Sequence, residues 1–184
     1  MSKIVVVYHS GYGHTQRMAQ AVAEGAGAEL LTIDADGNLS EGGWETLSAA
    51  DAIIMGSPTY MGSVSWQFKK FADASSKIWY TQAWKDKLFA GFTNSASVNG
   101  DKMSTLSYLF TLAMQQGGIW VSQGILPSSN KASQRNDANY LGSYSGAMSQ
   151  SPSDAGANEM FPGDLENAKN FGKRVADVAG KFQR

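Results

Sequence analysis

A turn-rich segment near the start of the chain carries hydroxyl groups and glycines at a spacing that suits an anion. Residues 10–15 follow the apolar run Ile4–Tyr8 and precede a run of strong helix formers. The start of a helix offers free N–H groups and the positive end of its dipole, and glycines let a ligand approach the backbone. The segment therefore predicts a phosphate site held by amides and by the hydroxyls of Ser10 and Thr15. An ordinary glycine turn capped by Thr15 is the alternative.

Two later segments suit the other parts of a flat, phosphorylated ligand. Residues 56–63 follow a second apolar run, and their proline and glycines hold Tyr60 and Met61 in a rigid turn. This segment predicts a wall for one edge of a planar heterocycle. Residues 93–100 follow a third apolar run and are almost all small and polar, which suits a polyol chain or a pyrimidine edge. Plain strand-to-helix connections remain the alternative, because glycine and proline punctuate many loops.

Two common phosphate-binding motifs do not fit. The pattern G-x-x-x-x-G-K-[ST] of nucleoside triphosphatases is absent, and residues 10–15 contain no lysine. Gly11 and Gly13 could begin a dinucleotide fingerprint, with Asp34 near the spacing of its ribose-binding acid. Gln16 stands where the third glycine belongs, so a monophosphate is favoured over a pyrophosphate.

Composition excludes several classes of chemistry and partner. The chain has no cysteine and only two histidines, His9 and His14, so a thiolate or histidine metal centre is not expected. No catalytic acid, base or nucleophile stands out. The 15 Lys and Arg residues against 16 Asp and Glu give a net charge of −1, which argues against a nucleic-acid surface. No apolar run is long enough for a membrane span, and the N-terminus lacks a signal-peptide pattern, so a cytoplasmic protein is expected.

The elements that must position these loops alternate along the chain. Five short apolar segments read as strands, the first as a strand buried on both faces: residues 4–8, 29–33, 51–56, 88–93 and 118–121. Helical patterns lie between and after them: residues 16–24 with a stop at Gly25, 44–49, 65–73, 104–116, and 164–182 with Asp164 as its cap. This order predicts an α/β fold, an open five-stranded parallel sheet with helices on both faces. Ligands of such sheets bind at the carboxyl ends of the strands.

One stretch interrupts the alternation. Residues 123–163 are rich in Ser, Asn, Gly and Ala, and a structureless loop of that length is uncommon in a compact domain. We expect residues 1–184 to form a single domain in which this loop acts as a lid or a partner contact. A surface excursion without a role is the alternative.

Taken together, the motifs resemble the flavodoxin-like FMN proteins. The first motif is Val7-Tyr8-His9-Ser10-x-Tyr12-Gly13-His14-Thr15, the second Gly56-Ser57-Pro58-Thr59-Tyr60-x-Gly62, and the third Lys87-Leu88-Phe89-Ala90-x-Phe92 with its polar loop. In this order they are similar to the NAD(P)H:quinone oxidoreductases of the tryptophan-repressor-binding-protein type. The resemblance covers essentially the whole chain.

The resemblance implies a role for each loop. It implies that one segment holds the FMN phosphate: Ser10, Gly11, Tyr12, Gly13, His14 and Thr15. It implies that a second lies along the isoalloxazine ring: Pro58, Thr59, Tyr60, Met61 and Gly62. It implies that a third surrounds the pyrimidine edge and the ribityl chain: Asn94, Ser95, Ala96, Ser97 and Asn99. Tyr12 would also face the nicotinamide, and Trp79 and Gln116 align with substrate-pocket positions. An interface aromatic is the alternative for Trp79.

The implied activity is an FMN-dependent oxidoreductase. It would pass hydride from NADH or NADPH through the flavin to a quinone or a similar small acceptor, with the flavin carrying the chemistry. The alternatives are a flavodoxin-type electron carrier, which the net charge of −1 disfavours, and a non-catalytic flavin-binding regulatory protein. The tryptophans and residues 123–163 favour a homo-oligomer, a dimer or a tetramer.

Overall fold

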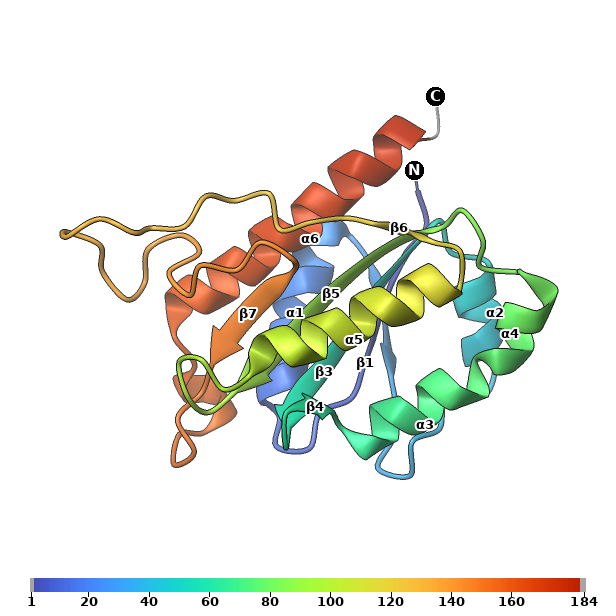
Figure 1. Ribbon diagram of the computed structural model, residues 1–184, viewed down its shortest axis with the longest axis horizontal. Helices are drawn as coiled ribbons and strands as arrows, with labels where there is room; N and C mark the ends of the chain where they lie inside the picture. Colours follow the sequence, from blue (N-terminus) through green and yellow to red (C-terminus); the bar gives the residue numbers. More distant parts are fainter. Residues whose placement is uncertain (1, 183–184) are drawn as a thin grey trace.

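The protein is built around one open sheet with helices on both faces (Figure 1). The structure, a computed structural model, describes residues 2–182. The main path of the sheet runs in the order β2, β1, β3, β5, β6, and neighbouring strands pair in parallel. The bounds are β1 Ile4–Tyr8, β2 Glu29–Thr32, β3 Ala52–Tyr60, β5 Leu88–Ser95 and β6 Ile119–Trp120. The predicted five-stranded parallel α/β fold is confirmed.

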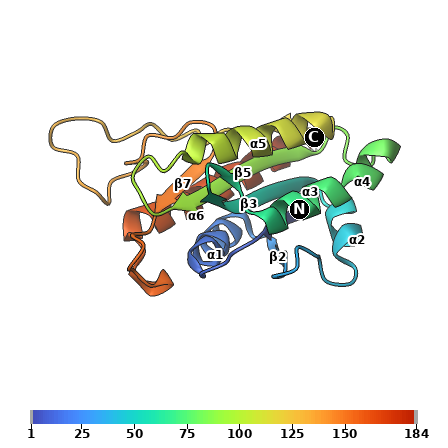
Figure 2. The same cartoon turned by 60° about the horizontal axis from the view of Figure 1, so that its bottom comes forward.

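Two helix layers cover the sheet. Helices α1 (His14–Ala26) and α6 (Pro162–Phe182) pack on one face, and α2 (Gly43–Ser48), α3 (Trp66–Ala74) and α5 (Lys102–Gln115) pack on the other. Figure 2 shows α1 and α5 on opposite sides of the strands. Every residue of β1 is buried, and Val6 faces the first core while Val5 and Val7 face the second. This two-sided burial is why the strand reads as a continuous apolar run.

Strand β3 is longer than its apolar residues indicate. It continues through Pro58 and Thr59 to Tyr60, which were predicted as a loop, and its last two residues, Thr59 and Tyr60, pair with β4 (Ser63–Val64) in a hairpin. Pro58 fits because it lies at the end of the ladder, opposite Asn94. The second of the three predicted loops, residues 56–63, therefore projects past the sheet as a rigid strand.

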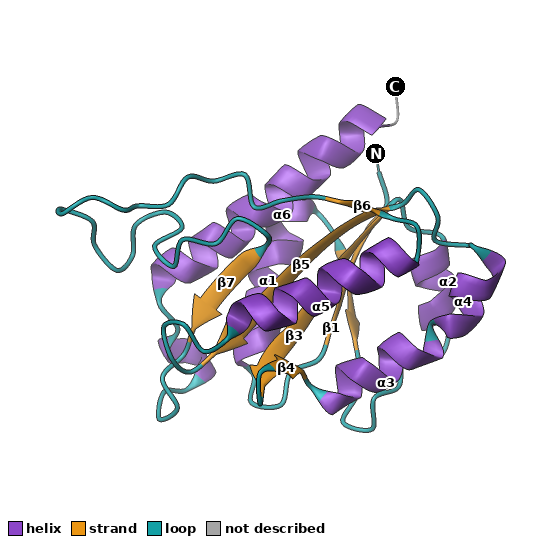
Figure 3. Cartoon of the chain, in the orientation of Figure 1, coloured by secondary structure: helices purple, strands orange, loops and turns teal. Residues whose placement is uncertain are grey.

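The prediction of a structureless loop over residues 123–163 is wrong in part. Strand β7 (Ala147–Gln150) lies within it and pairs in parallel with the second half of β5, while β6 pairs with the first half. The short helix η1 (Ala157–Glu159) follows. Residues 121–146, the excursion, leave the sheet between β6 and β7 (Figure 3). The side chain of Asn139 holds the excursion together through hydrogen bonds with Ile125 and Ser143.

Several helix limits also differ from the prediction. Helix α1 continues past Gly25 to Ala26. Gly25 does not end the helix; it allows close contact with the backbone of α6 at Lys169. Helix α6 begins at Pro162, so Asp164 lies inside its first turn and is not the cap. Helix α4 (Ser76–Thr81) was not predicted. The limits of α3 are close to prediction, and Ser65 caps it by accepting a hydrogen bond from the N–H of Phe68.

No helix within residues 2–182 is long and apolar enough to cross a membrane. No group of three or more His, Cys, Asp or Glu side chains gathers there in a way that could hold a metal ion.

Candidate functional site

A cavity of about 590 Å³ lies at the carboxyl ends of β1, β3 and β5. Four segments of the chain line it. Three are the loops singled out from sequence, through Ser10, Tyr12, His14 and Thr15, then Pro58, Thr59 and Tyr60, then Asn94, Ser95 and Ala96. The fourth comes after β7, through Ser151, Pro152, Ser153, Ala155 and Gly156. The volume lies in the range of small-molecule sites.

Some predicted residues of these loops do not line the cavity. Gly11 packs against the hydroxyl of Tyr60, and the other five lie within or beyond the lining loops: Gly13, Met61, Gly62, Ser97 and Asn99. Met61 is fully exposed at the tip of the β3–β4 hairpin. The three loops therefore meet, but the cavity uses only part of each.

The first loop ends in an open helix terminus. The hydroxyl of Ser10 accepts a hydrogen bond from the N–H of Gly13 at 3.1 Å, and Gly13 has a φ of +88°, which glycine adopts without strain. No side chain caps α1, and within the described residues the N–H groups of His14, Thr15 and Gln16 make no hydrogen bond. These donors and the helix dipole form an anion site beside the cavity.

The segment after β7 closes the cavity opposite α1. His14 donates a hydrogen bond from Nε2 to the carbonyl oxygen of Ala155 at 2.8 Å. The N–H of Gly156 donates to the Glu159 carboxylate at 2.7 Å, which shapes the turn into η1. His14 therefore holds two walls together. Sequence reasoning missed residues 151–156; the available signal was the composition of the segment, Pro152 between two serines, but the strand that precedes it was not predicted.

Aromatic rings form the mouth of the cavity. Tyr12 and Tyr60 meet edge to face, with ring centroids 6.3 Å apart. Burial raises the pKa of Tyr60, with a smaller contribution from Tyr12, so its hydroxyl stays protonated at neutral pH. Tyr12 is 79% exposed and is free to contact a second ligand above the cavity.

Buried hydroxyls fix the second loop. Thr59 donates to Thr105 on α5 and lies 2.8 Å from the hydroxyl of Thr93 on β5. Since Thr59 has one hydroxyl proton, Thr93 is the donor to Thr59. Ser57 accepts from the N–H of Ser65 at 3.0 Å. These contacts hold Pro58 and Tyr60 at the edge of the cavity.

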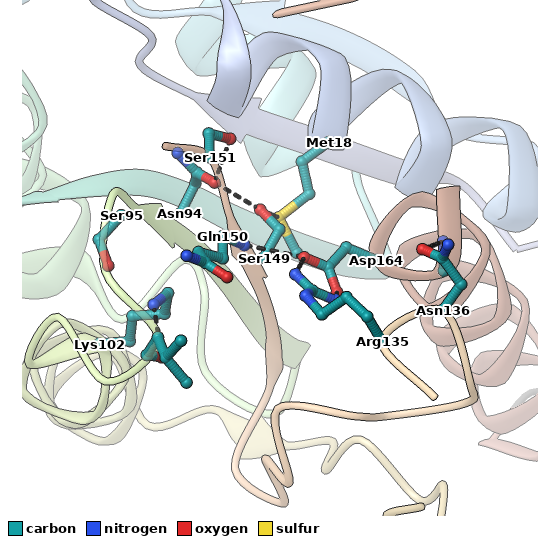
Figure 4. A network of polar contacts seen from close by, with 12 residues as sticks. Met18, Asn94, Ser95, Lys102, Arg135, Asn136, Ser149, Gln150, Ser151 and Asp164 are labelled. Atoms are coloured by element: carbon teal, nitrogen blue, oxygen red, sulfur yellow. Dashed lines mark hydrogen bonds and ion pairs between the residues drawn. The ribbon is translucent and has the colours of Figure 1, made fainter. Parts of the chain in front are cut away.

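Asn94 links the third loop to the wall after β7 (Figure 4). Its Oδ1 lies 2.8 Å from the hydroxyl of Ser149 and 2.9 Å from that of Ser151. The Nδ2 group makes no hydrogen bond among the described residues and is the polar atom left for a ligand. Asp164 supports the same wall by accepting from the N–H of Gln150 and from both terminal nitrogens of Arg135.

Within residues 2–182, no Asp, Glu, Lys or Arg side chain lines the cavity. The groups that these residues offer an anion are amides and hydroxyls, and no carboxylate among them is positioned as a general acid or base. Such a site suits an anionic cofactor that brings its own reactivity.

Trp79 and Gln116 lie elsewhere. They line a second pocket of about 240 Å³ that shares no lining residue with the cavity. Gln116 is buried and donates to the hydroxyl of Ser75 at 2.9 Å, while its Oε1 has no partner among the described residues. Within one copy of the chain, the structure does not bring these two residues to the other predicted site residues.

A family model and solved structures match this chain. Residues 44–132, a little less than half of the chain, match the model described as NADPH-dependent FMN reductase. A WrbA-like flavodoxin from Agrobacterium tumefaciens, known from its crystal structure, is 58% identical and superposes with a TM-score of 0.82, over 98% of this chain and 99% of that one.

Curated relatives match over nearly the full length. The chain is 58% identical to flavodoxin FldP from Pseudomonas aeruginosa, with 97% of each chain covered. It is 35% identical to an NAD(P)H dehydrogenase (quinone) from Geotalea uraniireducens, with 99% of this chain and 100% of the relative covered. The first name describes an electron carrier and the second an enzyme.

Proposed function

The chain belongs to the flavodoxin-like FMN-dependent NAD(P)H:quinone oxidoreductase family, and from this membership we propose that it binds FMN in the cavity described above and reduces a quinone-like acceptor with NADH or NADPH. One observation carries the proposal. An uncharged cavity of about 590 Å³ joins an uncapped helix terminus to an aromatic mouth, which matches a phosphate at one end and a flat ring at the other.

The residues present fit that cofactor. The free N–H groups of α1, with the hydroxyls of Ser10 and Thr15, would hold the phosphate. The free Nδ2 of Asn94 would bind the ribityl chain or the pyrimidine edge, and Tyr60 would flank the ring. Tyr12 would meet the nicotinamide from the open side.

FMN, when bound, supplies hydride acceptance and donation, so the protein needs no acid or base of its own. Its residues bind, orient and exclude water. The hydroxyl network around Thr59 keeps the ring-binding wall rigid, and His14 keeps the opposite wall closed on the phosphate end. Rigid positioning of this kind limits the acceptor to the exposed side of the cavity.

An electron-carrier function is the second candidate. The relative that is 58% identical over 97% of the chain carries the name flavodoxin, which favours it. The net charge of −1 disfavours it, because it gives little electrostatic steering toward a charged protein partner.

Trp79 and Gln116 enter the proposal only through a second copy of the chain. Their pocket is separate from the cavity, so they can contact an acceptor at the flavin only if a homo-oligomer brings them there. A homo-oligomer is therefore part of the proposed function.

An absorption experiment tests the proposal and separates the two functions. The protein is mixed with FMN, desalted, and treated without oxygen first with NADH or NADPH and then with benzoquinone. Flavin colour that stays with the protein, bleaches with one nucleotide and returns with the quinone supports the reductase. Retained flavin that neither nucleotide bleaches supports the carrier, and loss of all flavin on desalting rejects both.

A further inference from the structure

The loop that follows β5 is built around a buried lysine. Lys102, the first residue of α5, is fully buried, yet no carboxylate among residues 2–182 pairs with it. Its ammonium donates to three successive carbonyl oxygens, those of Ser97 at 2.6 Å, Val98 at 3.0 Å and Asn99 at 3.3 Å. Figure 4 shows Lys102 beside the strand that carries Ser95. An ammonium has three protons, so the loop uses all of them.

This arrangement decides where the amides of the loop point. The described chain has no cis peptide bond, and in a trans peptide the N–H and the C=O point in opposite directions. Because the three carbonyls turn toward Lys102 inside the protein, the N–H groups of Val98, Asn99 and Gly100 turn away from it. None of these three N–H groups makes a hydrogen bond among the described residues. Residues 96–99 are exposed; Ala96 lines the cavity, and residues 97–99 continue the same loop just beyond its lining.

We infer that Lys102 is a positioning residue for the flavin: its ammonium gathers three carbonyls of residues 97–99 and thereby presents the opposite N–H groups to the pyrimidine edge and ribityl oxygens of FMN. This inference rests on the proposed FMN function. Lys102 does not touch the cofactor, because its side chain is fully buried beneath the loop. A cation bound to a carbonyl also polarises the peptide and strengthens its N–H as a donor. A neutral lysine would lose this hold on the loop.

The protonation of Lys102 gives the inference a measurable signature. Burial lowers the pKa of Lys102 from 10.5 to about 8. The charged groups that face it are the Asp164 carboxylate on α6, which favours the ammonium, and the Arg135 guanidinium of the excursion, which opposes it. Burial raises the pKa of Tyr60 and brings that of Tyr108 to about 12, so neither tyrosine ionises near pH 8. Flavin affinity is therefore expected to fall as pH rises through about 8.

The stability of the fold changes in the opposite direction. Since the pKa of Lys102 is lower in the folded protein than its usual 10.5, the unfolded chain binds more protons between about pH 8 and 10.5. The contribution of this group to folding stability is lost as pH falls through about 8 and present above 10.5. A loss of flavin affinity at high pH would thus not arise from this lysine's effect on stability.

The experiment measures the dissociation constants of FMN and riboflavin by quenching of flavin fluorescence, from about pH 7 to about pH 9.5. We expect the affinity of the wild-type protein for both flavins to fall by about tenfold across this range. Lys102→Met should weaken both flavins at pH 7 by about 10- to 100-fold and should flatten the pH dependence. Riboflavin lacks the phosphate. An equal loss of affinity for FMN and riboflavin therefore shows that Lys102 acts through the loop and not by attracting the phosphate.

Lys87→Met is the matched control. Lys87 lies at the opposite end of β5, and its ammonium donates to the carbonyls of Ser48 at 2.8 Å and Ala50 at 2.5 Å. Burial also lowers the pKa of Lys87. This residue precedes the amino end of β5, however, whereas the cavity loop follows the carboxyl end of the same strand. This variant should keep the wild-type flavin affinity and its pH dependence.

The outcomes separate the inference from the function. A wild-type protein that binds no FMN rejects the proposed function itself. A wild-type protein that binds FMN and riboflavin with constant affinity from about pH 7 to about pH 9.5 overturns the inference and leaves the function intact, even if the variant fails to fold. Weaker FMN but unchanged riboflavin binding in Lys102→Met also overturns it, because the lysine would then act on the phosphate.

Discussion

The proposed phosphate site depends on a few residues at the start of α1. The N–H groups of His14, Thr15 and Gln16 are backbone donors that no side-chain substitution removes. The hydroxyls of Ser10 and Thr15 are the replaceable part of the same site, since both line the cavity. They give the most direct chemical test of the phosphate assignment.

Replacing Ser10 and Thr15 by alanine should weaken FMN binding by about 10- to 100-fold, because each hydroxyl gives a hydrogen bond to a charged group. Riboflavin binding should change little, since it has no phosphate. Fluorescence titration measures both, and circular dichroism checks the fold. Ser104→Ala, on the exposed side of α5, is the control. Equal FMN affinity in the double variant and the wild type would remove the phosphate from this loop.

At the scale of elements, α1 and α6 pack so closely that two glycines become part of the contact. A Cβ atom at Gly25 would overlap the carbonyl oxygen of Lys169, and one at Gly172 would overlap that of Val22. Gly180, also on α6, has open space around it. The effect of replacing glycine by alanine can therefore be compared at Gly25, inside the contact between α1 and α6, and at Gly180, outside it.

Gly25→Ala should lower the free energy of unfolding by about 1–3 kcal/mol, because the helices must separate to admit the methyl group. Gly180→Ala should raise it by about 0.5–1 kcal/mol, since alanine favours a helix more than glycine does. Urea unfolding measures both. Equal effects of the two substitutions would show that the helices do not meet at Gly25.

The excursion depends on an ion pair with little exposure. Arg135 binds both carboxylate oxygens of Asp164, and its guanidinium lies 3.7 Å from the centroid of the Phe161 ring. Asp164→Asn should destabilise the protein by about 1–3 kcal/mol, because it leaves a partly buried guanidinium without its charge partner. Asp73→Asn, which removes the exposed pair with Lys69, should cost less than about 1 kcal/mol. Thermal unfolding of both variants checks this, and similar losses would contradict it.

Some elements could be predicted from sequence because their signals are local. The run Ile4–Tyr8 defines β1 and the Ser65 cap defines the start of α3. Strand β7 has no such signal: its sequence Ala-Met-Ser-Gln contains no β-branched or aromatic residue, and it forms a strand through pairing with β5. Three cavity loops could be found because each follows a strand with an apolar sequence signal. Residues 151–156 were missed because they follow β7, which has none. Their position follows from β7.

At the scale of the whole molecule, the pocket of Trp79 and Gln116 lies away from the cavity, and this makes a prediction about assembly. If Trp79 contacts the acceptor, we expect it to do so at the flavin of another copy, because its pocket lies beside the amino end of β5 and the cavity lies at the carboxyl end. The protein should then elute as a dimer or larger in light-scattering chromatography. Trp79→Ala should lower kcat/KM for benzoquinone by about tenfold or more without changing FMN affinity.

Tyr80→Ala is the control for that experiment, since Tyr80 is exposed and does not line the second pocket. A monomeric protein, or an oligomer in which Trp79→Ala reduces quinone at the wild-type rate, would remove Trp79 from the acceptor site. Gln116 shares the pocket and would be removed with it.

The fourth lining segment, residues 151–156, also affects when during synthesis the cavity can form. The hydrogen bond that joins the two walls links His14 to Ala155, residues 141 positions apart. A chain emerging from the ribosome can pair β1, β2 and β3 long before Ala155 is made. The cavity cannot close until translation has reached Ala155, which lies in the last fifth of the chain. A chain that ends before β7 lacks this wall of the cavity, so we expect such fragments to bind FMN more weakly than the full chain.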